Sequence, residues 1–169
     1  MGTNERILLA VDDSDAARRS VRYVGQMVAG RGDVTVLLYH RLPALPPVLR
    51  EHGGAEDPRR ETELGRELTE RIADWVDGLE SGFLSTLDSL RKELTECGVA
   101  PDAVSFVVDR DVFPGESLAD ALRRVARERD CHTIVVADEH VPGIRGALYH
   151  HTGDALVKEG SGFALWVVE

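Results

Sequence analysis

The sequence has 169 residues, of which 43% are hydrophobic and 30% are charged, and its 30 acidic residues outnumber its 20 basic ones. A chain of this length can bury a sizeable core, and its composition excludes disordered and fibrous proteins. The net charge of −10 disfavours nucleic acid and anionic membranes as partners, because both would repel it. We therefore expect one domain over residues 1–169.

The apolar segments are too short for a signal peptide or a membrane span, which predicts a cytoplasmic protein with no membrane partner. Cys97 and Cys131 lie far apart and form no C-x-x-C pair, so we interpret them as reduced structural thiols. No carboxylate stands at a recognised zinc spacing from a histidine, so no metal site is predicted.

The first 40 residues follow a strand–helix–strand pattern. Arg6–Val11 is a short apolar run, typical of a strand buried on both faces. A polar run at 12–15 can cap a helix, whose apolar residues recur at helical spacing as far as Val28. Val34–Tyr39 then repeats the buried-strand pattern. This order predicts a right-handed βαβ unit in a parallel sheet.

The middle of the chain predicts a loop followed by one long helix. The segment from Leu42 to Arg60 is rich in proline and glycine, so we expect an irregular surface loop. Apolar residues recur every three or four positions from Leu64 to Leu94, which predicts an amphipathic helix that covers the sheet. A break near Gly78 or Gly82 stays open as an alternative.

The last third of the chain alternates strands and helices. The predicted strands are Val104–Val108, Thr133–Ala137 and Ala164–Val168. A helix is predicted to begin near Ser117, and a short one to run from about His151 to Glu159. The complete order predicts a single α/β domain with five strands.

Three segments resemble the universal stress protein family: ILLAVDDSDAARRSV, HTIVVADE and GFALWVVE. The resemblance spans roughly Glu5 to Glu169 and implies a Rossmann-like or flavodoxin-like fold. This fold is an open parallel five-stranded sheet of order 3-2-1-4-5, with helices on both faces and a ligand crevice between strands 1 and 4. It also implies a homodimer that pairs through the last strand, with candidate interface residues Ala164, Trp166 and Val168.

The first of these segments supplies candidate ligand residues. Asp12 matches the aspartate that the family places near the adenine, and Asp13 and Ser14 follow it at the expected end of the strand. The other interpretation is that all three side chains only cap the first helix. The two roles are compatible.

The family's phosphate loop, G-x2-G-x9-G-[S/T], is not intact here. Its glycines let the backbone approach phosphates, and its last residues donate hydrogen bonds at a helix start. Ungapped alignment places other residues at its four positions: Ala137, His140, His150 and His151. A shifted register gives a second set, with two glycines but no hydroxyl: His140, Gly143, Gly153 and Asp154.

Acidic residues follow the fourth strand, where Asp138 and Glu139 stand. A carboxylate 4 Å from a phosphate charge costs about 1 kcal/mol in water and about 4 kcal/mol at an effective dielectric of 20. Protonation of the three histidines at the family's loop positions would partly offset this charge, which makes a pH-sensitive anion site conceivable. Solvated surface histidines are the simpler interpretation.

The leading hypothesis is a dimeric cytoplasmic stress-response module that binds a protein or small-molecule partner, without ATP or another cofactor. We find no catalytic residue, since Ser14 has no base partner that the sequence reveals. The alternative is a nucleotide-binding regulatory switch for ATP or AMP. It would use Asp12 and a remodelled loop over residues 143–154, with Mg-ATP as ligand and at most weak hydrolysis.

Overall fold

The computed structural model describes residues 5–50, 54, 56–112, 115–137, 147–158 and 162–169. Its strands are β1 (Glu5–Ala10), β2 (Val34–Arg41), β3 (Val104–Asp109), β4 (Thr133–Ala137) and β5 (Ala164–Val168). Its helices are α1 (Asp15–Val28), α2 (Pro58–Glu96), α3 (Leu118–Glu128) and α4 (Ala147–Lys158), with short 3₁₀ turns η1 (Pro47–Leu49) and η2 (Pro101–Ala103).

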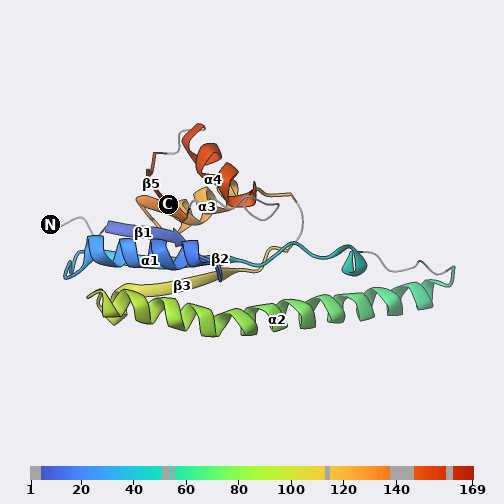
Figure 1. Cartoon of the computed structure of the whole chain (residues 1–169). Coiled ribbons are helices and arrows are strands. Elements are labelled where there is room, and N and C mark those ends of the chain that lie inside the picture. Colours follow the sequence, from blue (N-terminus) through green and yellow to red (C-terminus); the bar gives the residue numbers. More distant parts are fainter. Residues whose placement is uncertain (1–4, 51–53, 55, 113–114, 138–146, 159–161) are drawn as a thin grey trace.

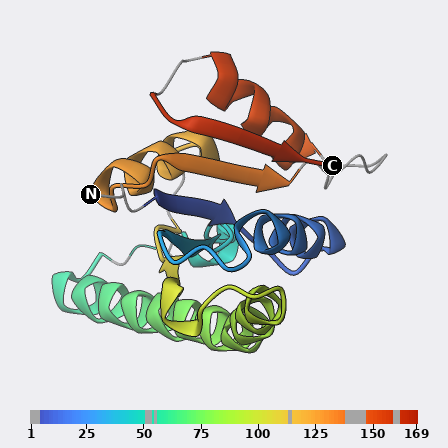
Figure 2. The ribbon, with the colours of Figure 1, turned by 90° about the vertical axis from the view of Figure 1, so that its left-hand side faces the viewer.

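The strands form one sheet in the order β3-β2-β1-β4-β5, and all neighbours run parallel. Helices α1 and α2 cover one face, and α3 and α4 cover the other (Figures 1 and 2). The predicted α/β fold and strand order are thus confirmed. From β1 the sheet grows through β2 and β3 on one side and through β4 and β5 on the other, so the strand order has a switch point between β1 and β4. In open parallel sheets, ligands bind at such a switch point.

Strand β1 lies at the centre of the sheet and is buried from both sides. Ile7 and Leu9 pack in the core beneath α1 and α2, whereas Leu8 and Ala10 pack in the core beneath α3 and α4. Because successive side chains point to opposite faces, a strand covered on both faces must be apolar at every position. This explains why an unbroken apolar run predicts this strand.

Helix α2 differs from the prediction at its start and in its continuity. It begins at Pro58 instead of Leu64, because Asp57 caps it by accepting a hydrogen bond from the Arg59 amide at 2.9 Å. It runs unbroken through Gly78 and Gly82. Each glycine costs up to about 1 kcal/mol in a helix, and the apolar stripe packed along the helix outweighs that cost.

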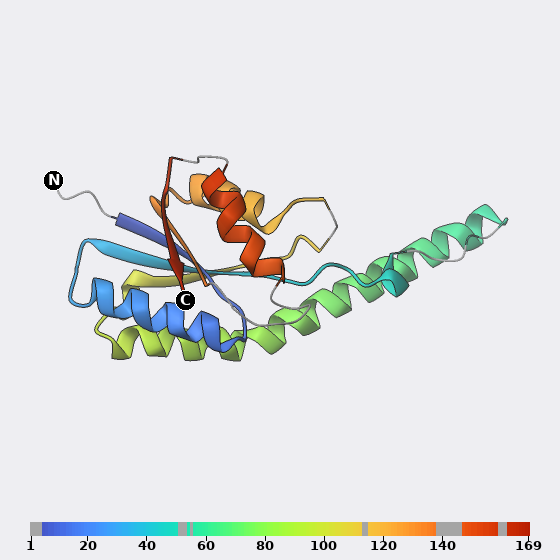
Figure 3. The same cartoon turned by 45° about the horizontal axis from the view of Figure 1, so that its top comes forward.

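The 39 residues of α2 correspond to a length of roughly 58 Å at 1.5 Å per residue. Its C-terminal half packs against the sheet and α1, and its N-terminal half projects past the sheet as an arm (Figure 3). We define the arm as residues 58–79 together with the segment 42–50 that runs beside them. Leu42, Leu45 and Leu49 pack there in a small core with Val76.

Other boundaries differ by a few residues. Strand β2 continues to Arg41 because its register with β3 continues to the pair Arg41–Asp109. The predicted loop from Leu42 to Arg60 contains η1 and the first turn of α2. Helix α4 begins at Ala147, one turn before the predicted His151.

Helices α1 and α2 approach closely at Gly25. A Cβ atom added at Gly25 would lie 2.7 Å from Cys97 Cβ, which is shorter than real contacts of this kind. Further along, Glu93 accepts hydrogen bonds from Arg18 at 2.5 Å and Arg22 at 3.1 Å. The missing side chain at Gly25 therefore sets how near α2 lies to α1.

We predict opposite effects for two glycine-to-alanine substitutions. Gly25→Ala should lower the free energy of unfolding, because overpacking typically costs about 1–3 kcal/mol. Gly78→Ala is the matched control: its added Cβ meets no atom within 4 Å, so better helix propensity should stabilise the protein by about 0.5–1 kcal/mol. Urea unfolding of both variants measures the difference, and equal stabilities would contradict the close approach.

Candidate functional site

The turn after β1 lies at the carboxyl edge of the sheet, beside the switch point. Asp12 Oδ1 accepts a hydrogen bond from the Ser14 amide at 2.9 Å, and Ser14 Oγ accepts one from the Ala17 amide at 3.1 Å. Ser14 is thus the N-cap of α1, which confirms the capping interpretation for Ser14. Asp13 is exposed and Asp12 is half-buried, so carboxylates line this edge of the sheet.

His40 is a residue of this edge that the sequence reasoning missed. Its Nδ1 lies 2.9 Å from the carbonyl oxygen of Val11, and its ring stacks on Phe83 with centroids 3.4 Å apart and planes 12° apart. A carbonyl oxygen only accepts, so Nδ1 carries the proton and donates. His40 therefore joins the end of β1 to helix α2.

The hydrogen bond from His40 extends the pairing of β1 with β2 past the end of β1. The Val11 amide donates to the Tyr39 carbonyl at 2.8 Å, as in a continued ladder. The Val11 carbonyl instead accepts from the His40 side chain. Since β1 ends at Ala10 and β2 continues to Arg41 beside β3, the imidazole satisfies a carbonyl at the point where the two strands part.

The surroundings of His40 hold its imidazole neutral at pH 7. Burial lowers the pKa of His40 below its ordinary value of 6.5. The hydrogen bond to Val11 and the charges of Asp12 and Asp13 raise the pKa, but they do not offset the burial. The sequence signal that could have pointed to His40 is its position at the end of a buried strand, which is the ligand-binding edge of a parallel sheet.

On the other face of the same edge, Tyr39 belongs to a polar network. Its hydroxyl donates to Asp109 Oδ2 at 2.6 Å, and Arg124 donates to that same oxygen at 3.1 Å. Arg124 also binds Glu116 through two hydrogen bonds of 3.0 Å. Burial and the Asp109 hydrogen bond raise the pKa of Tyr39 far above its ordinary range. This network joins β2 and β3 to α3.

The Asp109 carboxylate at the centre of this network stays charged. Burial acts to raise the pKa of Asp109, but hydrogen bonds from Tyr39 and the Asp111 amide, together with the Arg124 charge, lower it overall. The side chains involved bond to one another, and so we interpret the network as structural.

The predicted phosphate-loop residues fall partly outside the described residues. Ala137 is buried as the last residue of β4. Asp138, His140 and Gly143 lie outside the described residues, as does Glu139. The backbone at His150 and His151 belongs to α4.

Gly153 lies inside α4 and packs on the sheet. It is the seventh residue of this helix, and Asp154 follows as an exposed residue. A Cβ at Gly153 would lie 3.6 Å from Val167 and 4.0 Å from Val136. Only the first turn of a helix offers free amide donors to an anion, so the Gly153 position suits packing against β4 and β5 rather than phosphate binding.

Arg123 anchors α4 to α3. It is buried, and it donates to the Ala155 carbonyl of α4 at 2.6 Å and to Asp120 at 3.1 Å. Thr152 is also buried on α4. These contacts place α4 against the sheet beside the switch point.

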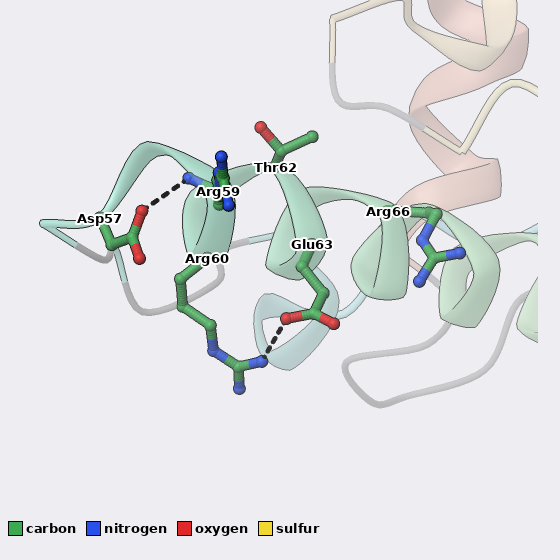
Figure 4. A pocket seen from close by; sticks show the side chains of 6 residues that line it. All are labelled: Asp57, Arg59, Arg60, Thr62, Glu63 and Arg66. Carbon is green, nitrogen blue, oxygen red and sulfur yellow. Dashed lines mark hydrogen bonds and ion pairs between the residues drawn. The ribbon is translucent and has the colours of Figure 1, made fainter.

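A hollow at the tip of the arm is lined by acidic and basic side chains (Figure 4). Its lining residues are Asp57, Arg59, Arg60, Thr62, Glu63 and Arg66. Arg60 donates to Glu63 at 2.8 Å, so acidic groups of the lining partly neutralise the arginines. The hollow lies at the start of α2, far along the helix from the part that packs on the sheet (Figure 3).

Within the described part of the chain, no group of three or more His, Cys, Asp or Glu side chains is placed to hold a metal ion. Among the same residues, no helix has the length and apolar character that crossing a bilayer requires.

An open parallel sheet with a switch point beside a capped strand–helix turn defines the doubly wound α/β class, whose members bind ligands at this edge. The sequence matches the Universal stress protein family over residues 3–161. The chain therefore belongs to the universal stress protein family.

Solved structures share this fold. A universal stress family protein from Burkholderia pseudomallei is 18% identical, with a TM-score of 0.63 over 98% of this chain and 96% of that chain. One from Archaeoglobus fulgidus is 16% identical, with a TM-score of 0.56 over 98% and 93%. A universal stress protein in complex with cAMP is 16% identical, with a TM-score of 0.57 over 99% and 98%. A comparison with curated protein sequences gives no match.

We predict that His40 stabilises the fold in a pH-dependent way. Its folded pKa lies below 6.5, so its contribution is complete above pH 6.5 and is lost as the pH falls below that value. His40→Leu leaves the Val11 carbonyl without its donor, which should cost about 1–3 kcal/mol near neutral pH and less in acid. Urea unfolding at neutral and at acid pH measures the loss of stability in His40→Leu and its dependence on pH.

The matched control is His132→Leu at an exposed position, which should change stability by less than about 0.5 kcal/mol. NMR titration of the His40 ring gives its pKa directly. A value at or above 6.5, or a His40→Leu effect that does not vary with pH, would contradict the arrangement.

Proposed function

We propose that this protein is a dimeric cytoplasmic stress-response module that binds a protein or small-molecule partner without a chemical step, and that ATP is not its ligand. The position of Gly153 is the observation that argues against ATP as the ligand. Gly153 is the one glycine within α4, and it lies in the interior of the helix, where it packs on Val136 and Val167.

Phosphate binding of the family type needs glycines in the loop and free donors at the start of the following helix. The ungapped register supplies Ala137 and three histidines instead of these residues. The shifted register depends on Gly153 and Asp154, which are the seventh and eighth residues of α4. Neither register therefore supports a triphosphate site.

The capping role of Ser14 supports the proposal that the protein carries out no chemical step. The hydroxyl oxygen of Ser14 accepts from the Ala17 amide and caps α1. No hydrogen bond to a basic side chain is found for Ser14 among the described residues, and a serine nucleophile needs such a base. Its position at a strand-to-helix turn is thus explained by capping.

A nucleotide-binding switch is the second candidate. One structure of the same fold is a universal stress protein in complex with cAMP, a nucleotide with a single phosphate. Such a ligand needs fewer phosphate contacts than ATP. In this second candidate the turn at Asp12 contacts the base, and residues 143–154 supply the remaining contacts.

Calorimetric titration of the nucleotide-stripped protein with Mg-ATP and, separately, with cAMP distinguishes the two candidates. We expect no saturable heat with ATP, because Gly153 lies inside α4, where its amide is not free to bind a phosphate. Mass spectrometry of any small molecule released before stripping is the companion measurement. Saturable binding of ATP at micromolar concentration would overturn the proposal, and binding of cAMP alone would favour the switch.

The proposed dimer pairs through β5, which lies at one edge of the sheet. Ala164 is exposed, and Trp166 and Val168 are half-buried against the core beneath α1. Trp166 contacts Tyr23 of α1 edge-on, with ring centroids 6.2 Å apart. Tyr23 is 44% exposed, and Met27, one turn along α1, is 54% exposed. This apolar surface beside an open edge supports subunit pairing.

Trp166→Asp should shift the protein from dimer to monomer, since it places a charge in the proposed contact. Met27→Asp is the second variant, because its exposed position leaves the core intact. Val48→Asp on η1, at a position that is 71% exposed, is the control and should stay dimeric. Sedimentation velocity measures the oligomeric state of the three variants. An unchanged dimer in both interface variants would contradict the proposed contact.

A further inference from the structure

We draw no further inference here: the strongest candidate, the exposed apolar stretch of Phe106 on β3 and Leu84 on α2 at the edge of the sheet, carries none because nothing in the described part of the structure shows what covers it.

Discussion

Burial of β1 on both faces is the constraint on which the rest of the structure depends. Ile7, Leu8 and Leu9 are fully buried, and each side chain of this size contributes about 1.5–3 kcal/mol when it leaves water. A strand that is apolar on both faces needs a helix layer on each, and parallel neighbours need crossover connections that supply those helices. The two-sided α/β architecture is the consequence.

The helix layer on the α1 side is organised by close contact between α1 and α2. Gly25 lets the helices approach at Cys97, and Glu93 joins two arginines of α1. With its C-terminal half held in this way, α2 continues past the sheet, because a small separate core covers the inner side of the arm. The arm thus has its own small core and is joined to the rest of the domain through the continuous helix α2.

The carboxyl edge of the sheet combines a ligand-binding topology with groups that serve the fold. Ser14 caps α1, His40 satisfies the Val11 carbonyl, and Gly153 packs α4 on the sheet. Each of these residue types has ligand-binding roles in other proteins, and here each has a structural partner. For this reason the proposed function gives no residue of this edge a chemical step.

The sequence by itself determined the order of elements and the parallel sheet, because apolar runs and helical spacing are local patterns. Three of its segments, by their resemblance, also indicated the family. The sequence also indicated the cap at Ser14, since capping involves residues only a few positions apart. Only the tertiary structure decided the rest. Whether α2 breaks at Gly78 depends on what its apolar stripe packs against. The role of Gly153 depends on Val136 and Val167, and that of His40 on Val11 and Phe83. These contacts join residues distant in sequence, and such pairs leave no local pattern that a single chain can reveal.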